Sequence, residues 1–235
     1  MIRYRPVLKR WYFAARLHRF TPAGVFEFLA GLAMLSRWID VHKREGYSDF
    51  CTGKFDYNKR YNLYRHVIAE EKLNDEIDYL EFGVAKGHSF RWWAANITHP
   101  KARFFGFDTF TGLPEDWGHF KKGDMSGNNE PPLMDDVRCR FYQGLFQQTL
   151  PSFIRSYIPG KRRVIMMDAD LFSSTLYALT ALHPLLTRGD IIIFDEFNVP
   201  LHEFKAFRHW LSAYYITYQV LGSVNNFHQV AIKIL

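Results

Sequence analysis

Short hydrophobic runs alternate with helically spaced hydrophobic residues from residue 77 to the end of the chain. The runs are rich in β-branched and aromatic residues, which is typical of strands. They predict seven strands, at 77–82, 103–108, 139–143, 163–168, 190–195, 217–222 and 227–234. Strands that alternate with helices indicate a parallel sheet covered on both faces.

Three helices are predicted among these strands. Residues 89–97 follow the first strand, and residues 204–214 follow the fifth, with apolar and charged side chains on opposite sides. Leucines at three- and four-residue steps follow a helix cap at Ser173 and Ser174. Only residues 223–226 separate the last two strands, which is too short for a parallel crossover, so these strands pair antiparallel. We therefore expect an α/β protein with a doubly wound, seven-stranded, mostly parallel sheet that ends in an antiparallel hairpin.

An apolar stretch, residues 22–39, precedes the sheet. Charged residues and glycines interrupt it and no small-residue cleavage pattern follows, so it predicts neither a signal peptide nor a span of ~20 apolar residues. Thr21 as N-cap and Pro22 in the first turn predict an amphipathic helix instead. Its apolar stripe consists of Phe26, Leu29, Ala33 and Leu35. We expect a lid or dimer helix packed on the domain, with a peripheral membrane contact as the alternative.

The net charge of +6 is concentrated in the first twenty residues. The basic residues there, with no acidic ones, are Arg3, Arg5, Lys9, Arg10, Arg16 and Arg19. The rest of the chain carries 24 basic and 24 acidic residues, so the folded body is neutral by this count. We therefore expect no nucleic-acid partner, and only a weak peripheral membrane contact through the basic N-terminus.

Length and composition narrow the class of protein. A chain of 235 residues, 48% hydrophobic and 17% aromatic, is neither disordered nor fibrous and has the size of one large domain. Cys51 and Cys139 are too few for a disulfide framework and too isolated for a zinc site, so a cytoplasmic location is expected. We divide the chain into a basic arm with a helical extension, residues 1–60, and a main domain, residues 61–235.

The first strand ends in a carboxylate and a turn with two glycines, from Glu81 to Gly87. In an open parallel sheet, ligands bind beyond the carboxyl ends of the strands, and glycines let them approach the backbone. The dinucleotide fingerprint GxGxxG is absent, and an acidic residue would repel a pyrophosphate. Glu81 suits a cationic ligand end, such as the ammonium or sulfonium of S-adenosylmethionine. An ordinary structural turn is the alternative.

Asp108, at the end of the second strand, is placed to accept hydrogen bonds from both hydroxyls of a ribose. The alternative is a cap for the turn that begins at Thr109. After the third strand, Phe146 and Gln147 would lie beside the ribose site and could contact an adenine. Phe146 could equally belong to the core.

Four carboxylates stand at the ends of the fourth and fifth strands: Asp168, Asp170, Asp195 and Glu196. Adjacent strands lie about 4.8 Å apart, so these groups converge on one spot. Unpaired carboxylates in a cleft repel one another, and a bound hard divalent cation usually offsets this repulsion. Magnesium fits these oxygen ligands better than zinc does. Such a cation can hold a substrate hydroxyl and lower its pKa. Helix caps or ion pairs with Lys and Arg are the alternative roles.

Four spaced blocks carry these residues: YLEFGVAKGHS at 79–89, GFDTFTGLPEDW at 106–117, MDADLFSST at 167–175 and FDEF at 194–197. Together they resemble the macrocin O-methyltransferase family, class I S-adenosylmethionine-dependent enzymes that methylate sugar hydroxyls of macrolides. The resemblance runs from about residue 60 to the C-terminus. It implies a Rossmann-like methyltransferase fold, S-adenosylmethionine as cofactor and a magnesium ion.

The resemblance also implies roles for individual residues. The wider catechol-type O-methyltransferases place metal ligands at the same two strand ends, here Asp168, Asp195 and Glu196. Their lysine base, three residues after the first ligand, is replaced by Leu171. The candidate general bases are therefore His119, in the long loop 110–133, and Asp170, and we count Asp168 with them as catalytic.

The predicted contacts of S-adenosylmethionine are Glu81, Phe82, Gly83, Gly87, Ser89, Asp108, Thr109, Phe146, Gln147 and Asp168. Among them, Glu81, Gly83 and Ser89 are assigned to the methionine end. Asp108 is assigned to the ribose, and Phe146 with Gln147 to the adenine.

The acceptor would be determined by the loop 110–133 and the first sixty residues. The resemblance favours a hydroxyl of a sugar, glycan or natural product, with phenols as the alternative. Two other functions remain open: a non-catalytic cofactor- or glycan-binding protein, and a carboxylate–metal hydrolase, which would be indifferent to Asp108→Ala. The apolar N-terminal helix predicts a homodimer.

Overall fold

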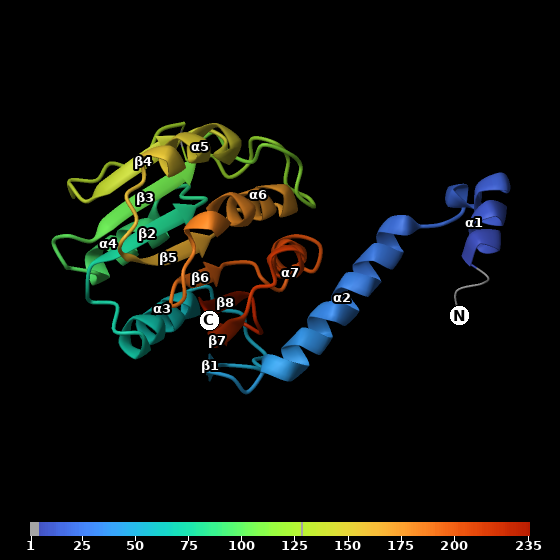
Figure 1. Ribbon diagram of the computed structural model, residues 1–235, viewed down its shortest axis with the longest axis horizontal. Coiled ribbons are helices and arrows are strands. Elements are labelled where there is room, and N and C mark those ends of the chain that lie inside the picture. The colour runs from blue at the N-terminus through green and yellow to red at the C-terminus, as the bar shows by residue number, and fades with distance from the viewer. Residues whose placement is uncertain (1–4, 128) are drawn as a thin grey trace.

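One eight-stranded sheet runs through the body of the protein (Figure 1). The computed structural model describes residues 5–127 and 129–235, so Arg3 of the basic arm and Asn128 of the loop 110–133 lie outside the described residues. The strand order is β1-β7-β8-β6-β5-β2-β3-β4. The bounds are Tyr47–Ser48 (β1), Ile77–Phe82 (β2), Arg103–Asp108 (β3), Cys139–Gln143 (β4), Arg162–Met167 (β5), Ile191–Phe194 (β6), Tyr218–Val224 (β7) and Gln229–Ile234 (β8).

Seven of these strands are the ones that the hydrophobic runs predict, but the predicted number of seven is wrong by one. The additional strand, β1, pairs parallel with β7 through Tyr47 and Ser48. A strand of two residues is too short to show any alternation, so the hydrophobic pattern does not reveal it. β1 brings the segment before residue 60 onto the edge of the sheet.

The mixed ending of the sheet is confirmed. β8 lies between β6 and β7 and pairs antiparallel with both, whereas the pairs among β2 to β6 are all parallel. The chain winds from β2 outward to β4, returns to β5 and continues outward to β6 in the other direction. The strand order therefore reverses between β2 and β5, which is the place where open α/β sheets bind ligands.

Helices cover both faces of the sheet and give the body three layers (Figure 1). On one face lie α5 (Phe146–Ser156), α6 (Phe172–Leu182) and α7 (Glu203–Tyr214). On the other lie α3 (Lys59–Glu70) and α4 (His88–Asn96). All residues of β2 are buried, as expected for a central parallel strand whose two faces are both covered.

The two predicted helix caps differ from the structure. α2 (Ala23–His42) begins after Pro22 without a side-chain cap, and the Thr21 hydroxyl donates instead to a preceding carbonyl group at 2.9 Å. At the start of α6, the Ser173 hydroxyl donates to Glu115 at 2.7 Å. In both places the hydroxyl group donates its proton elsewhere, and its oxygen accepts no capping hydrogen bond from the first N–H groups of the helix.

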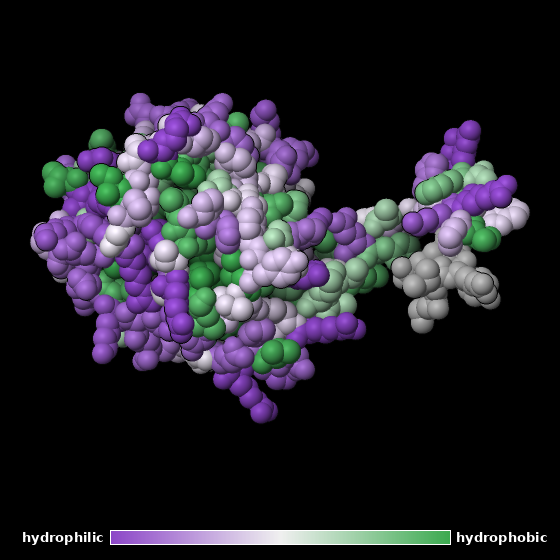
Figure 2. Space-filling view, viewed as in Figure 1, coloured by the Kyte–Doolittle hydropathy of each residue, from purple (hydrophilic) through white to green (hydrophobic). Residues whose placement is uncertain are grey.

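The N-terminal segment forms an arm that projects from the body (Figures 1 and 2). It consists of α1 (Arg5–Ala14), a 3-10 turn (Leu17–Arg19) and the first half of α2. Across residues 5–127 and 129–235, no helix is long and apolar enough to cross a membrane.

α2 packs on the body from Gly31 onward, and before that point Glu27 forms an ion pair with Lys205 of α7. Leu35 is buried, and the ring centres of Trp38 and Phe197 lie 4.7 Å apart. Phe26 and Leu29, which belong to the predicted apolar stripe, are exposed instead. The helix therefore carries a second apolar face that its own domain leaves open.

Candidate active site

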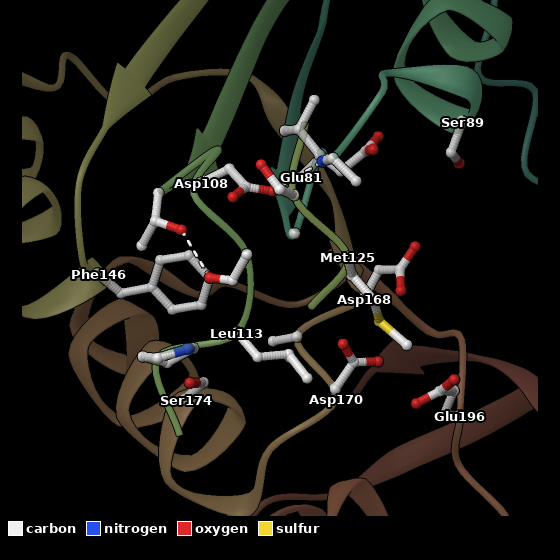
Figure 3. Close-up of a pocket in the computed structure, with 18 of the residues that line it drawn as sticks. Glu81, Ser89, Asp108, Leu113, Met125, Phe146, Asp168, Asp170, Ser174 and Glu196 are labelled. Carbon is white, nitrogen blue, oxygen red and sulfur yellow. Dashed lines mark hydrogen bonds between the residues drawn. The ribbon is translucent and has the colours of Figure 1, made fainter. Parts of the chain in front are cut away.

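A cavity of about 850 Å³ opens at the carboxyl ends of β2, β3 and β5 (Figure 3). The predicted cofactor contacts that line it are Glu81, Gly83, Ser89, Asp108, Thr109, Phe146, Gln147 and Asp168. Phe82 and Gly87 are not among its described lining residues. Phe82 is buried in the core, and Gly87 precedes α4. The cavity thus lies at the reversal of strand order and gathers most of the residues that the sequence points to.

The turn after β2 requires glycine at position 83. Gly83 N donates to Phe107 O at 3.0 Å, and Asp168 N donates to Phe82 O at 2.9 Å, so the turns after β2 and β5 lie against each other. Gly83 has a φ of 93°, and a Cβ there would stand 1.7 Å from the Asp168 carbonyl oxygen. No side chain fits this gap, and the bare backbone leaves that part of the cavity open to a ligand.

Glu81 lines the cavity with its side chain almost entirely buried. The Tyr79 hydroxyl donates to its carboxyl group. Burial raises the pKa of Glu81 to about 8, although the Tyr79 bond and the nearby Arg60 guanidinium oppose the rise. A carboxyl group in this environment gains from a cationic ligand, which is the role predicted for Glu81.

The raised pKa of Glu81 predicts a pH-dependent stability. The pKa of Glu81 is about 8 in the folded protein and 4.5 in the unfolded chain. The contribution of Glu81 to the free energy of unfolding is therefore fully present below pH 4.5 and is lost as the pH rises through 8. Glu81→Gln keeps an acceptor for Tyr79 and cannot ionise. We expect this variant to be more stable than the wild type above pH 8, by roughly 1–3 kcal/mol, with the advantage shrinking toward pH 4.5.

Urea unfolding at a series of pH values measures this difference. The matched control is Glu70→Gln, which changes an exposed carboxylate on α3 and should alter the stability by less than about 0.5 kcal/mol, as surface substitutions usually do. A Glu81→Gln difference that stays constant with pH would show that Glu81 ionises as it does in the unfolded chain.

Both carboxylate oxygens of Asp108 accept hydrogen bonds from the backbone. Ala85 N donates to Oδ2 and Phe110 N donates to Oδ1, each at 2.7 Å. The turn-capping role considered from the sequence is therefore present. Each carboxylate oxygen has a second lone pair, and Asp108 also lines the cavity, so the group that fixes the turn is held in place to accept two further hydroxyls.

Phe146 and Gln147 begin α5 and form another wall of the cavity. The Phe146 ring meets the Phe82 ring edge-on, with 5.2 Å between the ring centres, so Phe146 belongs to the core and to the cavity at once. The first N–H groups of a helix have no partner within it. This wall therefore offers an aromatic surface beside the N–H groups at the start of α5, which suits a flat heterocycle such as adenine.

Three carboxyl groups, those of Asp168, Asp170 and Glu196, line the cavity beyond β5 and β6 (Figure 3). Burial raises the pKa of each above its ordinary value. For Asp168 and Glu196, the repulsion of neighbouring carboxyl groups, Asp170 among them, adds to this effect. The cluster therefore favours bound protons or a bound cation.

This cluster has the donor chemistry of a divalent-cation site. Carboxylate oxygens are the ligands that magnesium prefers, and Oε2 of Glu196 is buried without a hydrogen-bond partner among the described residues. In the part of the chain that the structure describes, however, no group of three or more His, Cys, Asp or Glu is arranged to hold a metal ion. The magnesium site of Asp168, Asp195 and Glu196 therefore stays a prediction.

Besides Phe82 and Gly87, two further predicted site residues, Asp195 and His119, are not among the described lining residues of the cavity. The buried Asp195 carboxyl group accepts hydrogen bonds from the Tyr57 hydroxyl and, at 3.3 Å, from the Gln229 side chain. His119 is exposed on the loop 110–133. The predicted catalytic residues that do line the cavity are Asp168 and Asp170.

Tyr57 and Arg60 line the cavity although the sequence did not identify them. Arg60 is nearly buried at the start of α3, and its guanidinium lies 4.0 Å from the centre of the Tyr57 ring. It places a positive charge close enough to lower the pKa of Glu81. Without the fold, a lone arginine carries no signal of such a position, because most arginines are exposed.

The loop 110–133 forms one side of the cavity through Leu113, Met125 and Ser126. Ser126 Oγ donates to a backbone carbonyl within the loop at 3.0 Å. Glu115 accepts the Ser173 hydrogen bond and ties the loop to α6. The described residues of the loop thus form a wall of the cavity, in the position from which a lid would close over a ligand.

Residues 80–197 match a protein family described as "Methyltransferase domain". Mycinamicin III 3''-O-methyltransferase of Micromonospora griseorubida is 26% identical over 185 residues, which cover 66% of this chain and 70% of that protein. The 8-demethyl-8-(2,3-dimethoxy-alpha-L-rhamnosyl)-tetracenomycin-C 4'-O-methyltransferase of Streptomyces olivaceus is 39% identical over 67 residues, which cover 28% of this chain and 24% of that protein.

Solved structures share the fold. The calicheamicin methyltransferase CalS11 superposes with a TM-score of 0.61 at 20% identity, over 91% of this chain and 93% of that one. The O-methyltransferase NovP gives a TM-score of 0.54 at 17% identity, over 88% of this chain and 98% of that one. At these identities the likeness concerns the fold alone.

Proposed function

The chain belongs to the methyltransferase-domain family, and on that premise we propose that it is an S-adenosylmethionine-dependent O-methyltransferase that methylates a hydroxyl group of a sugar or glycan, such as one carried by a natural product. The observation that carries the proposal is the cavity at the reversal of strand order. It brings together Glu81, Asp108 and Asp170, which suit the cationic end of the cofactor, its ribose and the acceptor proton.

The names of the relatives support this acceptor class. Both are O-methyltransferases by name, and the name of the Streptomyces protein includes a rhamnosyl group. A sugar hydroxyl is therefore preferred over a phenol as the acceptor.

Different residues of the cavity would bind different parts of the cofactor. S-adenosylmethionine supplies a methyl group on a cationic sulfonium. Glu81 binds the ammonium of the methionine end, and Gly83 leaves the backbone free for close approach. Asp108, held by two backbone N–H groups, accepts the ribose hydroxyls, and Phe146 packs against the adenine.

Asp170 is the group that we assign as general base. Its carboxyl group lines the cavity, whereas His119 does not, and burial raises its pKa, which makes it a stronger base. The proton of the acceptor hydroxyl passes to Asp170 as the oxygen takes the methyl group and the carbon–sulfur bond breaks. Beyond this general-base catalysis, most of the rate enhancement comes from the positioning of the two reactants, because the reaction needs no covalent intermediate with the protein.

We include a magnesium ion held by Asp168, Asp195 and Glu196, which would lower the pKa of the acceptor hydroxyl. Asp168 and Glu196 line the cavity, and the unpartnered Oε2 of Glu196 supports a ligand there. For Asp195 to take part, its carboxyl group must exchange the Tyr57 hydroxyl for the ion. The transfer of the acceptor proton to Asp170 does not require this ion.

A transfer assay tests the proposal. The chain is incubated with S-adenosylmethionine carrying a deuterated methyl group and with paired acceptors, glycosylated macrolides and their aglycones, with magnesium or with a chelator. We expect mass spectrometry to find the label on a sugar oxygen of the glycosylated acceptors alone. Label on aglycones or added catechols would overturn the sugar assignment. Cofactor binding without transfer to any acceptor would favour the non-catalytic binding protein.

The predicted cytoplasmic location and homodimer stay predictions.

A further inference from the structure

The arm carries an apolar surface that the described residues of the body leave open (Figure 2). We define the arm surface by its exposed large apolar side chains: Val7, Leu8, Trp11, Phe13, Leu17, Phe20, Val25, Phe26, Phe28, Leu29 and Leu32. Trp11 is 68% exposed and Phe20 is 82% exposed. Isolated exposed apolar residues are normal, but a group of this size marks a binding surface.

The arm surface is distinct from the face of α2 that binds its own domain. Gly31 and Leu35 are buried against the body. A Cβ at Gly31 would lie 3.1 Å from a side chain in the loop before α7. At 3.6 residues per turn, Phe26 and Leu29 lie on the other side of the helix from Gly31 and Leu35, where they are exposed. The body therefore already occupies the one face and leaves the other to a partner.

Positive charge borders the arm surface. Its exposed cations include Lys9, Arg10, Arg16 and Arg19. Among the described residues up to 39, the only acidic one is Glu27, and it is paired with Lys205 of α7 at 2.6 Å. The arm thus presents aromatic and aliphatic side chains together with cations that have no acidic neighbour on the arm.

The first helix combines these two properties. In α1, Val7, Leu8 and Trp11 share one side at helical spacing, and Lys9 lies on the opposite side. Basic amphipathic helices with Trp and Leu on the apolar face lie in the interface of lipid bilayers. Trp and Tyr side chains are enriched at that depth, because one end of each ring system is apolar and the other is polar.

A second copy of the chain would fit this surface less well. If two arms met, cations would lie against cations. If the arm met the body of a second copy, the cations beside Trp11 would meet a surface whose charges balance by count. An anionic lipid surface takes apolar side chains between its acyl chains and sets a phosphate against each cation. We propose that the arm surface binds anionic lipid membranes peripherally and holds the body of the protein against them.

Vesicle flotation with the full chain tests this proposal. The probes are vesicles of phosphatidylcholine alone and vesicles of phosphatidylcholine and phosphatidylglycerol in equal parts. We expect strong binding to the mixed vesicles, weak binding to the neutral ones, and a loss of binding as salt is added, because salt screens the cations. Binding is read without the cofactor or an acceptor, so its outcome is independent of the methyltransferase assignment.

Two double variants separate the apolar and the charged parts of the arm surface. Trp11→Ser with Phe20→Ser should weaken binding to mixed vesicles by about tenfold for each ring removed from the bilayer. Lys9→Gln with Arg10→Gln should weaken it about twenty-five-fold, because each cation near an anionic surface contributes roughly fivefold.

Matched variants on the body control for altered solubility. Val137→Ser with Ile158→Ser removes two apolar side chains that are also largely exposed, and Arg155→Gln with Arg188→Gln removes two exposed cations. Both should bind mixed vesicles as the wild type does. Equal binding to both kinds of vesicle, or no binding, would overturn the proposal. A dimer in sedimentation velocity that Trp11→Ser with Phe20→Ser dissociates, without lipid binding, would assign the surface to a second copy.

Discussion

The Asp170→Asn variant should lose methyl transfer by about a hundredfold to ten-thousandfold, the usual contribution of a general base, while it still binds S-adenosylmethionine. The amide cannot take the proton of the acceptor hydroxyl. Asp170 has a φ of 57°, a left-handed conformation that asparagine adopts readily, so the turn after β5 keeps its shape. The deuterated-methyl assay measures the rate, and unfolding in urea checks the fold.

His119→Asn is the matched control for this prediction. It also replaces a candidate base by an amide, but at an exposed position outside the cavity lining. We expect this variant to transfer methyl groups at the wild-type rate. The opposite pattern, with His119→Asn inactive and Asp170→Asn active, would move the general base to the loop 110–133 and require that loop to close over the acceptor.

Replacement of Gly83 by alanine should destabilise the protein by about 3 kcal/mol or more, near the upper end for single substitutions. The new Cβ would overlap the Asp168 carbonyl oxygen, from which it would stand only 1.7 Å. Relief requires the turns after β2 and β5 to separate, and the backbone bond from Asp168 N to Phe82 O lies between them. Urea unfolding measures the loss of stability.

Gly123→Ala isolates the part of this loss that comes from the backbone alone. Gly123 has a φ of 91°, close to the 93° of Gly83, but a Cβ at Gly123 would meet no atom within 4 Å. We expect a loss of roughly 1–2 kcal/mol, the cost of a left-handed conformation for alanine. Equal losses at the two positions would show that the turns after β2 and β5 part easily.

The central sheet could be predicted from the sequence because buried parallel strands give continuous hydrophobic runs. β2, β3 and β4 have the predicted bounds, and the resemblance to a methyltransferase family is confirmed by the family match. β1 was missed because a strand of two residues shows no pattern. α5 was also missed, although it carries a helical signal: Phe146, Leu150, Phe153 and Ile154 recur at i, i+4, i+7 and i+8. Pro151 inside the helix argues against a helix by local rules, and the structure accommodates it.

The sequence predicted those site residues that lie at the ends of strands. Glu81, Asp108 and Asp168 stand where the topology puts ligand-binding residues, and the structure places them around one cavity. At the end of β6, the sequence predicted Asp195 and Glu196 together. Neighbouring residues of an extended chain point to opposite sides, and the structure directs Glu196 to the cavity and Asp195 to Tyr57.

The remaining part of the site could not be predicted because it comes from the segment before the sheet. Tyr57 and Arg60 reach the cavity only because β1 pairs with β7 and leads the chain into α3 beside it. That path depends on long-range pairing of a two-residue strand. Local hydrophobic periodicity carries no information about such a contact.

Titration calorimetry with S-adenosylmethionine tests the central claim most directly. The wild type should bind in the micromolar range, and Asp108→Ala should bind about a hundredfold more weakly, because two hydrogen bonds from hydroxyls to a carboxylate are lost. Asp116→Ala, which removes a loop carboxylate paired with Lys121 outside the cavity, should bind as the wild type does. No heat of binding by the wild type, or equal affinities of the wild type and Asp108→Ala, would contradict the methyltransferase site described here and favour a carboxylate–metal hydrolase.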